Sequence, residues 1–132
     1  MREIKFRYRL KNIKTGKIIV KIFTIKEIES HDFSSWFENY EILSRDEYTS
    51  KNDKDKKEIY EDDIIKRQYG VGYSSKNYPS FVDGTQRETI IIVEWNETST
   101  GYIGLAKPFD SNFYVEFEII GNKYENPELL EK

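Results

Sequence analysis

The residues best suited to chemistry lie in one acidic run, EIYEDDIIK, at positions 58–66. Carboxylate oxygens bind hard cations such as Mg²⁺ and Ca²⁺, and paired carboxylates can act as general acid and base. The spacing, however, lacks the central glycine and the twelfth-position ligand of an EF-hand loop. Because charge runs are usually turns or solvated faces, we interpret the run as a turn between two strands, with no metal and no cofactor. The acids of the run, with two that precede it, are Asp53, Asp55, Glu58, Glu61, Asp62 and Asp63.

Other catalytic patterns are missing from the sequence. The chain contains no cysteine and a single histidine, His31. Thiolate nucleophiles, disulfides and cysteine metal sites are therefore excluded, and His31 has no second imidazole with which to share a metal. The glycines of the GVG segment at 70–72 are too few for a phosphate-binding loop and do not open a helix. We predict that the protein is not an enzyme.

The composition is that of a folded protein with an uneven charge. Of its 132 residues, 15% are aromatic, which separates the chain from disordered sequences. Residues 1–30 hold nine Lys or Arg and three Glu (net +6), whereas residues 31–132 carry a net charge of −9. No apolar run could span a bilayer, and the first residues lack the apolar core of a signal peptide. We therefore expect a cytoplasmic protein that does not contact a membrane.

The first quarter of the chain predicts a β-hairpin. Apolar residues at positions 4, 6, 8 and 10 alternate with a basic strip formed by Lys5, Arg7, Arg9 and Lys11. Gly16 suits the turn, and a second strand over 17–28 is apolar on both faces. Such a strand lies either in the middle of a sheet or at an edge that a partner covers. Its first face carries Ile18, Val20 and Ile22, and its second carries Ile19, Phe23 and Ile25.

The remaining segments predict short strands separated by polar loops. A helical turn is expected around Trp36 and Phe37, an exposed loop with a short strand inside it over 68–86, and further strands over 88–95 and 112–121. The chain is therefore predicted to be mainly β, with little helix. We expect an N-terminal β subdomain containing the hairpin (1–50), a polar connecting loop (51–57), and a small SH3-like barrel (58–132) packed with the first subdomain.

The acidic run also fits a known kind of corner. In small SH3-like barrels, a similar aliphatic–x–x–Gly–Asp–aliphatic corner turns the chain into a strand. Asp62 stands at the glycine position, and aspartate is one of the few other residues that tolerate a positive φ. Asp63 would then accept backbone N–H bonds in the turn.

The segment EILSRDEYTSKNDKDKKEIYEDDIIK resembles the motif of the YopX family, small proteins found mostly in bacteriophages and prophages. That motif typically reads "qyTGLkDknGkeIyegDiV", and the family's loop glycines are here replaced by Ser50, Lys56 and Asp62. The ending IIGNKYENPELL looks like the family's "viGNiyEnpeLl", which implies a turn at Gly121 and Asn122. The opening REIKFR is similar to the family start. The resemblance implies a mostly β fold in a bacterial host cell and supplies no biochemical activity.

Two functions remain open. Contact with protein is favoured, because aromatic residues suit interfaces and the oppositely charged parts of the chain favour a homo-oligomer; a host or phage protein is the other expected partner. Nucleic-acid binding is the alternative, and the acidic remainder of the chain opposes it. In that case the basic strip would contact phosphates, and loop aromatics would stack on bases. Those aromatics are Tyr69, Tyr73, Tyr78 and Phe81.

Overall fold

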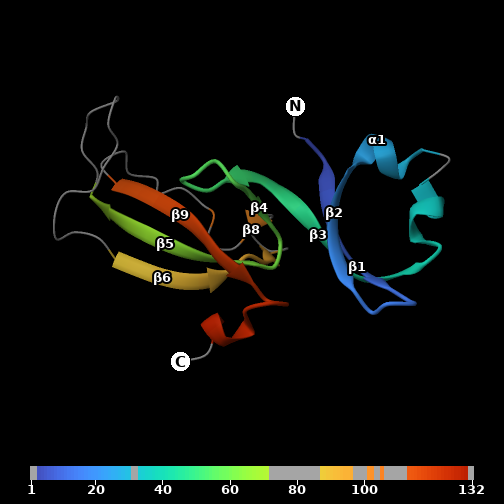
Figure 1. Ribbon diagram of the computed structural model, residues 1–132. Coiled ribbons are helices and arrows are strands. Elements are labelled where there is room, and N and C mark those ends of the chain that lie inside the picture. The colour runs from blue at the N-terminus through green and yellow to red at the C-terminus, as the bar shows by residue number, and fades with distance from the viewer. Residues whose placement is uncertain are drawn as a thin grey trace. The chain divides into compact units, whose positions relative to one another are not determined.

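The computed structural model describes residues 3–30, 33–71, 87–96, 101–102, 105 and 113–130 (Figure 1). Across these residues the chain is mainly β with antiparallel sheets and little helix, which confirms the predicted mainly β class. The chain divides into two units, Met1–Ser50 and Lys51–Lys132. Tyr73, Tyr78 and Phe81 lie outside the described residues.

The first unit is built on the predicted hairpin. Strand β1 (Lys5–Asn12) pairs with β2 (Ile18–Thr24) on one side and with β3 (Tyr40–Asn52) on the other, both antiparallel. Among the described strands the sheet order is β2-β1-β3-β4, where β4 spans Glu58–Tyr60, so β2 is an edge strand. A single helical turn, α1 (Ile25–Ile28), and a 3-10 helix, η1 (Phe33–Phe37), connect β2 to β3. The latter is the helical turn expected around Phe37.

Local contacts explain both ends of β2. Asn12 Oδ1 accepts hydrogen bonds from the amides of Lys14 and Thr15 at 2.9 and 3.0 Å, and Gly16 takes a φ of 75°, which closes the hairpin. At the other end, Thr24 and Glu27 form a capping box that starts α1. The predicted second strand over 17–28 therefore ends at Thr24.

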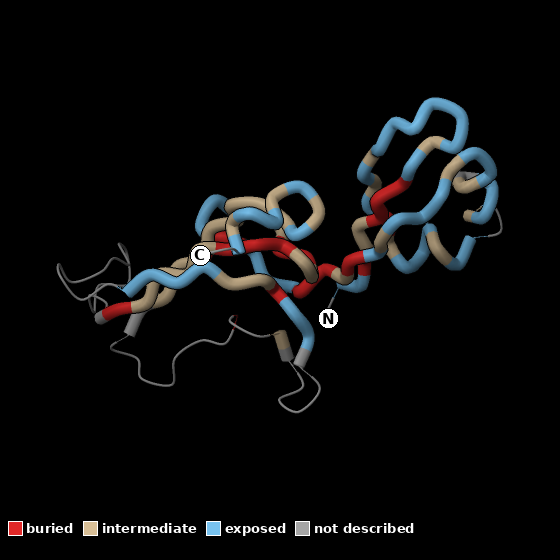
Figure 2. Tube along the Cα trace, turned by 90° about the horizontal axis from the view of Figure 1, so that it is seen from below, coloured by how far each residue is buried: buried red, intermediate tan, exposed pale blue. Residues whose placement is uncertain are grey.

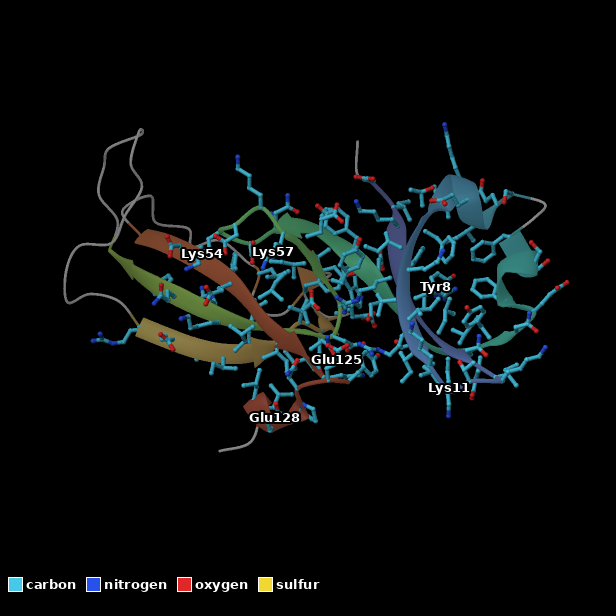
Figure 3. All side chains as sticks on the ribbon, in the orientation of Figure 1. Tyr8, Lys11, Lys54, Lys57, Glu125 and Glu128 are labelled. Carbon is cyan, nitrogen blue, oxygen red and sulfur yellow. The ribbon has the colours of Figure 1, made fainter. Side chains whose placement is uncertain are left out.

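The core of the first unit is aromatic. Tyr8 packs edge-to-face on Phe23, with ring centroids 5.3 Å apart, and Phe33 packs on Phe37 at 4.8 Å. Tyr8 points from β1 toward these rings (Figure 3). Buried residues gather on β1, whereas the hairpin turn is exposed (Figure 2). The alternation in β1 thus gives one face to the core, as its period of two predicts.

The second unit contains a three-stranded sheet of order β6-β5-β9 and a two-stranded ribbon, β7-β8. Its core is formed by Ile59, Ile65, Val93, Leu105 and Phe117. Among the described strands, no pairing closes a barrel. The elements are β4 (Glu58–Tyr60), β5 (Asp63–Val71), β6 (Arg87–Ile92), β7 (Trp95–Asn96), β8 (Gly101–Tyr102), β9 (Phe113–Asn122) and the 3-10 helix η2 (Pro127–Leu130).

Residues 51–57, expected to form a connecting loop, have a more ordered structure. Strand β3 continues to Asn52, and a tight turn then leads into β4. Asp53 Oδ1 accepts from the amides of Asp55 and Lys57 at 2.9 Å each, while Asp53 Oδ2 accepts from the amide of Ile119 at 3.2 Å. A segment without apolar residues is thus held by hydrogen bonds to β9.

The expected loop over 68–86 also differs at its start. Strand β5 extends to Val71, so Tyr69 lies in a strand. Tyr69 is opposite Arg87 of β6 on one side and opposite Val115 of β9 on the other. Pairing on both sides of β5 overrides the weak strand propensity of the glycine-rich sequence.

Candidate interaction surfaces

The acidic run forms the corner between β4 and β5. Asp62 takes a φ of 73°, the left-handed conformation that favours glycine. The buried carboxylate of Asp63, only 2% exposed, accepts the amide hydrogen of Tyr60 at 2.8 Å. Asp62 Oδ2 accepts from the Tyr124 hydroxyl at 3.0 Å, and Asp62 Oδ1 lies 3.3 Å from Lys123 Nζ. These two carboxylates therefore hold the corner together.

Two other positions share the backbone conformation of Asp62. The non-glycine residues with positive φ in the described ranges are Ser50 at 68°, Lys56 at 67° and Asp62 at 73°. They are the three residues that replace the loop glycines of the YopX motif. The backbone has kept the turn geometry that glycine would adopt at no steric cost. The motif therefore specifies turns, and this chain forms them with strained residues.

The cation-site hypothesis has no geometric support where the structure describes the chain. No group of three or more Asp, Glu or His side chains among the described residues is arranged to hold a metal ion. Asp53 is turned toward backbone amides, and Glu58 Oε1 accepts from the Tyr60 hydroxyl at 3.0 Å. The acids that lie close in sequence thus serve different turns.

A second turn, in the closing segment IIGNKYENPELL, lies at the end of β9. Asn122 Oδ1 accepts from the amides of Tyr124 and Glu125 at 3.0 and 2.9 Å. The side chain of Asn126 folds back so that a Cβ added to Gly121 would lie 2.6 Å from Asn126 Oδ1. Gly121 is therefore required by close approach, and Asn122 by its local hydrogen bonds.

The basic strip of β1 is largely used within the first unit. Arg7 Nη2 lies 2.9 Å from Asp46 Oδ2, whose side chain is 3% exposed. Lys5 is buried, with its ammonium 4.7 Å from the centre of the Tyr48 ring and 3.4 Å from Glu3 Oε1. Arg9 is buried as well. The strip is therefore covered because β1 is an inner strand.

Of the four residues of this strip, Lys11 alone is exposed, whereas Arg7 is half-buried. Lys11 is exposed beside the β1–β2 hairpin and points away from the core (Figure 3). The structure thus does not bring the four basic residues together as an open phosphate-binding strip. Sequence reasoning missed Asp46, the partner of Arg7. The only signal was its place in β3, which the register sets opposite Arg7.

Tyr69 has basic neighbours on β5 and β6. The guanidinium carbon of Arg67 lies 5.0 Å from the centre of the Tyr69 ring, and Arg87 is opposite Tyr69 across the strands. Arg67 Nε is buried and has no hydrogen-bond partner among the residues that the structure describes. The structure therefore groups Tyr69 with two arginines that the sequence analysis did not single out.

The outer strand of the first sheet carries a row of exposed apolar side chains, the β2 row: Ile18, Val20 and Ile22. Their exposed fractions are 48%, 47% and 48%. They lie on one face because alternate residues of a strand point to the same side. The structure thus settles the choice left open by the sequence: β2 is at the edge of its sheet.

The second unit presents a charged face instead. Glu118 of β9 lies 3.1 Å from Lys54 Nζ and 3.4 Å from Lys66 Nζ. Hydrogen bonding with Lys54, then with Lys66, lowers the pKa of Glu118 from its ordinary value. The same contact with Glu118 raises the pKa of Lys54. This solvent-exposed face is suited to water rather than to apolar contact.

Together, these features define a small, mainly β protein of two units whose distinctive sequence motifs form turns. The family model described as YopX protein matches residues 5–131. The chain therefore belongs to the YopX family, as the resemblance of its motifs predicted. No curated protein and no solved structure matches it. Within the described residues, no helix has the length and hydropathy needed to cross a membrane.

Proposed function

We propose that this protein is a non-enzymatic accessory protein of bacteriophages and prophages. It acts in the cytoplasm of the bacterial host by binding protein, including other copies of itself. The observation that carries the proposal is the β2 row, in which three β-branched residues on an edge strand are each about half exposed. An edge strand of this kind is a template for pairing with another chain.

The composition of β2 supports this use of the edge. Natural sheets protect their edges with prolines, bulges or charged side chains. The face of β2 that bears Ile18, Val20 and Ile22 has no charged residue within the strand, and Lys21 is on the other face. Burial of exposed isoleucine and valine side chains in a contact is favourable by roughly 25 cal/mol per Å² of apolar surface.

The acidic corner supports a role without catalysis. The carboxylates of Asp62 and Asp63 accept hydrogen bonds from a tyrosine hydroxyl and a backbone amide. A catalytic pair would instead direct its carboxylates into a cleft. The same corner supports the finer proposal that residues 58–132 form an SH3-like barrel, because it turns the chain from β4 into β5 as the related barrel corners do.

Nucleic-acid binding is the second candidate, and the contact of Arg67 with Tyr69 favours it. A guanidinium on an aromatic ring, with Arg87 across the strands, resembles the stacking and charge used by proteins that bind single strands. Two of the four basic residues of β1, by contrast, are held in contacts with Asp46 and Tyr48.

Two measurements on the purified chain separate these candidates. Light scattering gives the molar mass, and fluorescence anisotropy tests labelled single-stranded DNA, duplex DNA and RNA at low and near-physiological salt. We expect a mass above one chain and no salt-sensitive binding. A single-chain mass, with binding that falls steeply with salt and is lost in Arg67→Ala, would overturn protein binding in favour of nucleic acid. The control is Lys14→Ala, which removes an exposed charge from the hairpin turn.

A further inference from the structure

We infer that the partner of the β2 row is a second copy of this chain, joined by antiparallel pairing of β2 with β2 about a two-fold axis at Val20. The inference rests on the proposed function and names the occupant of that surface. It is carried by three features of the first unit: the direction of the backbone groups of β2, the self-complementarity of its sequence, and the charges at its two ends.

The backbone groups of the β2 row point away from β1. The amide of Asn12 donates to the Lys17 carbonyl at 2.8 Å, and the amide of Ile25 donates to the Ile4 carbonyl at 3.1 Å. These bonds mark the two ends of the β1–β2 pairing, along which hydrogen-bonded and non-hydrogen-bonded residue pairs alternate. Counting residue pairs from either of these two bonds identifies the same outward-facing residues of β2. The residues whose backbone groups point to the outer edge are Ile18, Val20 and Ile22.

Pairing about Val20 sets the row against itself. In an antiparallel pair with this axis, Val20 is opposite Val20 of the second copy, and Ile18 is opposite Ile22 of the second copy. All six side chains lie on one face, because residues directly opposite each other in an antiparallel pair project to the same side of the sheet. Side chains that are directly opposite on one face of an antiparallel pair are in contact, and such cross-strand contacts stabilise a sheet.

Neighbouring axes are less favourable. An axis at Lys21 would place two lysines directly opposite each other, and an axis at Ile19 would place Lys17 opposite Lys21. Like charges in directly opposed positions destabilise a sheet. An axis at Ile22 would leave Ile18 without a partner on the second strand. Of these four axes, only the one at Val20 pairs all three residues of the β2 row with the same row of the second copy and places no lysine opposite a lysine.

The charges at the ends of β2 favour the antiparallel direction. The hairpin end carries three exposed lysines, Lys11, Lys14 and Lys17. The α1 end carries two exposed glutamates, Glu27 and Glu29, and one lysine. Antiparallel pairing brings the basic end of one copy beside the acidic end of the other, whereas parallel pairing would bring like charges together. The end charges and the side chains of β2 therefore both favour antiparallel pairing with a second copy.

Disulfide trapping tests this arrangement directly, because the chain has no native cysteine. Cα atoms of a hydrogen-bonded antiparallel pair are about 5.5 Å apart, within the disulfide range of roughly 4.4–6.8 Å. Val20→Cys should therefore form a covalent dimer under mild oxidation. The matched control is Ile18→Cys, an equally exposed site in the same row. Its two copies would be about 14 Å apart along the strands, since each residue advances roughly 3.4 Å.

Each outcome decides the inference. The expected result is at least a tenfold excess of cross-linked Val20→Cys over Ile18→Cys, with a mixed dimer when Ile18→Cys and Ile22→Cys are combined. Equal cross-linking of Val20→Cys and Ile18→Cys would overturn the pairing. A wild-type mass above one chain without cross-linking of Val20→Cys would overturn it too, while the proposed self-assembly would stand on another surface. A single-chain mass would overturn the second copy as the partner.

Discussion

The amide of Tyr60 donates a 2.8 Å hydrogen bond to the carboxylate of Asp63 across the corner between β4 and β5. Asp63 is almost fully buried at the first position of β5, beside the core residue Ile64. A buried carboxylate is costly unless it is hydrogen-bonded, so this contact links a local turn to the stability of the whole second unit. The acidic run that suggested chemistry is thus part of the fold.

Substitution of Asp63 should weaken the fold measurably. Asp63→Ala leaves the Tyr60 amide without its acceptor, which should lower the free energy of unfolding by roughly 1–3 kcal/mol. Urea unfolding followed by tryptophan fluorescence measures the change. Asp55→Ala, which removes an exposed carboxylate from the preceding turn, is the control and should have little effect. Equal losses in the two variants would contradict a special role for Asp63.

Lys56→Gly should stabilise the protein. At a φ of 67°, the lysine backbone has a strain of about 1–2 kcal/mol that glycine would relieve. Glycine also gains entropy in the unfolded chain, roughly 0.5–1 kcal/mol, so a net gain of about 0.5–1 kcal/mol is expected. Thermal and urea unfolding measure it. Lys57→Gly, at the neighbouring exposed lysine, should be neutral or destabilising, and a gain there as large as at Lys56 would contradict the strain argument.

Gly121→Ala should be destabilising because its Cβ would lie 2.6 Å from Asn126 Oδ1. Overpacking of this kind costs about 1–3 kcal/mol. The double variant Gly121→Ala with Asn126→Gly removes the obstructing side chain. In a double-mutant cycle, the second change should therefore cost less in the presence of the first than it does alone. Simple additivity of the two changes in unfolding free energy would show that the close approach is unimportant.

The Glu118 contacts predict a pH dependence. Its pKa is lowered in the folded state, mainly by hydrogen bonding with Lys54, so its contribution is present above the ordinary glutamate range. That contribution is lost as the pH falls through the lowered value. Glu118→Gln should therefore make the urea midpoint less sensitive to pH in the acidic range, and high salt should reduce the difference from wild type. Parallel pH profiles for the two proteins at low salt would contradict the prediction.

The sequence predicts local features of this protein better than its long-range contacts. The alternation in β1 and the corner at Asp62 depend on a few adjacent residues, and both are visible in the pattern of side chains and in the motif. The partner of Arg7 is different. Asp46 is 39 residues away, and only the register of β1 with β3 brings the two together. The alternation therefore predicted a basic strip open to solvent, although Arg7 is paired with Asp46 and Arg9 is buried.

The same limit explains the two segments for which the sequence predicts loops. Asp53 lies in a segment without apolar residues, but its carboxylate accepts the amide of Ile119, 66 residues further on. The position of Tyr69 in a strand has a similar cause, because β5 pairs with both β6 and β9. Periodicity reports the burial of side chains, and it does not report hydrogen bonds between distant strands. Polar or glycine-containing strand ends are consequently hard to recognise.

The most direct test of the central proposal is the molar mass of a chain whose β2 row has been made polar. Ile18→Thr, Val20→Thr and Ile22→Thr together keep β-branched side chains, and hence strand propensity, while removing apolar surface. The control is Ile90→Thr, which alters an isoleucine of similar exposure, 45%, on the edge strand β6. Circular dichroism should show that both variants keep their β structure.

Light scattering should give a mass above one chain for the wild type and for Ile90→Thr, and a mass of one chain for the triple variant. This result would place self-association on the β2 row. If the triple variant keeps the wild-type mass, or if the wild type has the mass of one chain at its highest soluble concentration, self-assembly through this strand is contradicted.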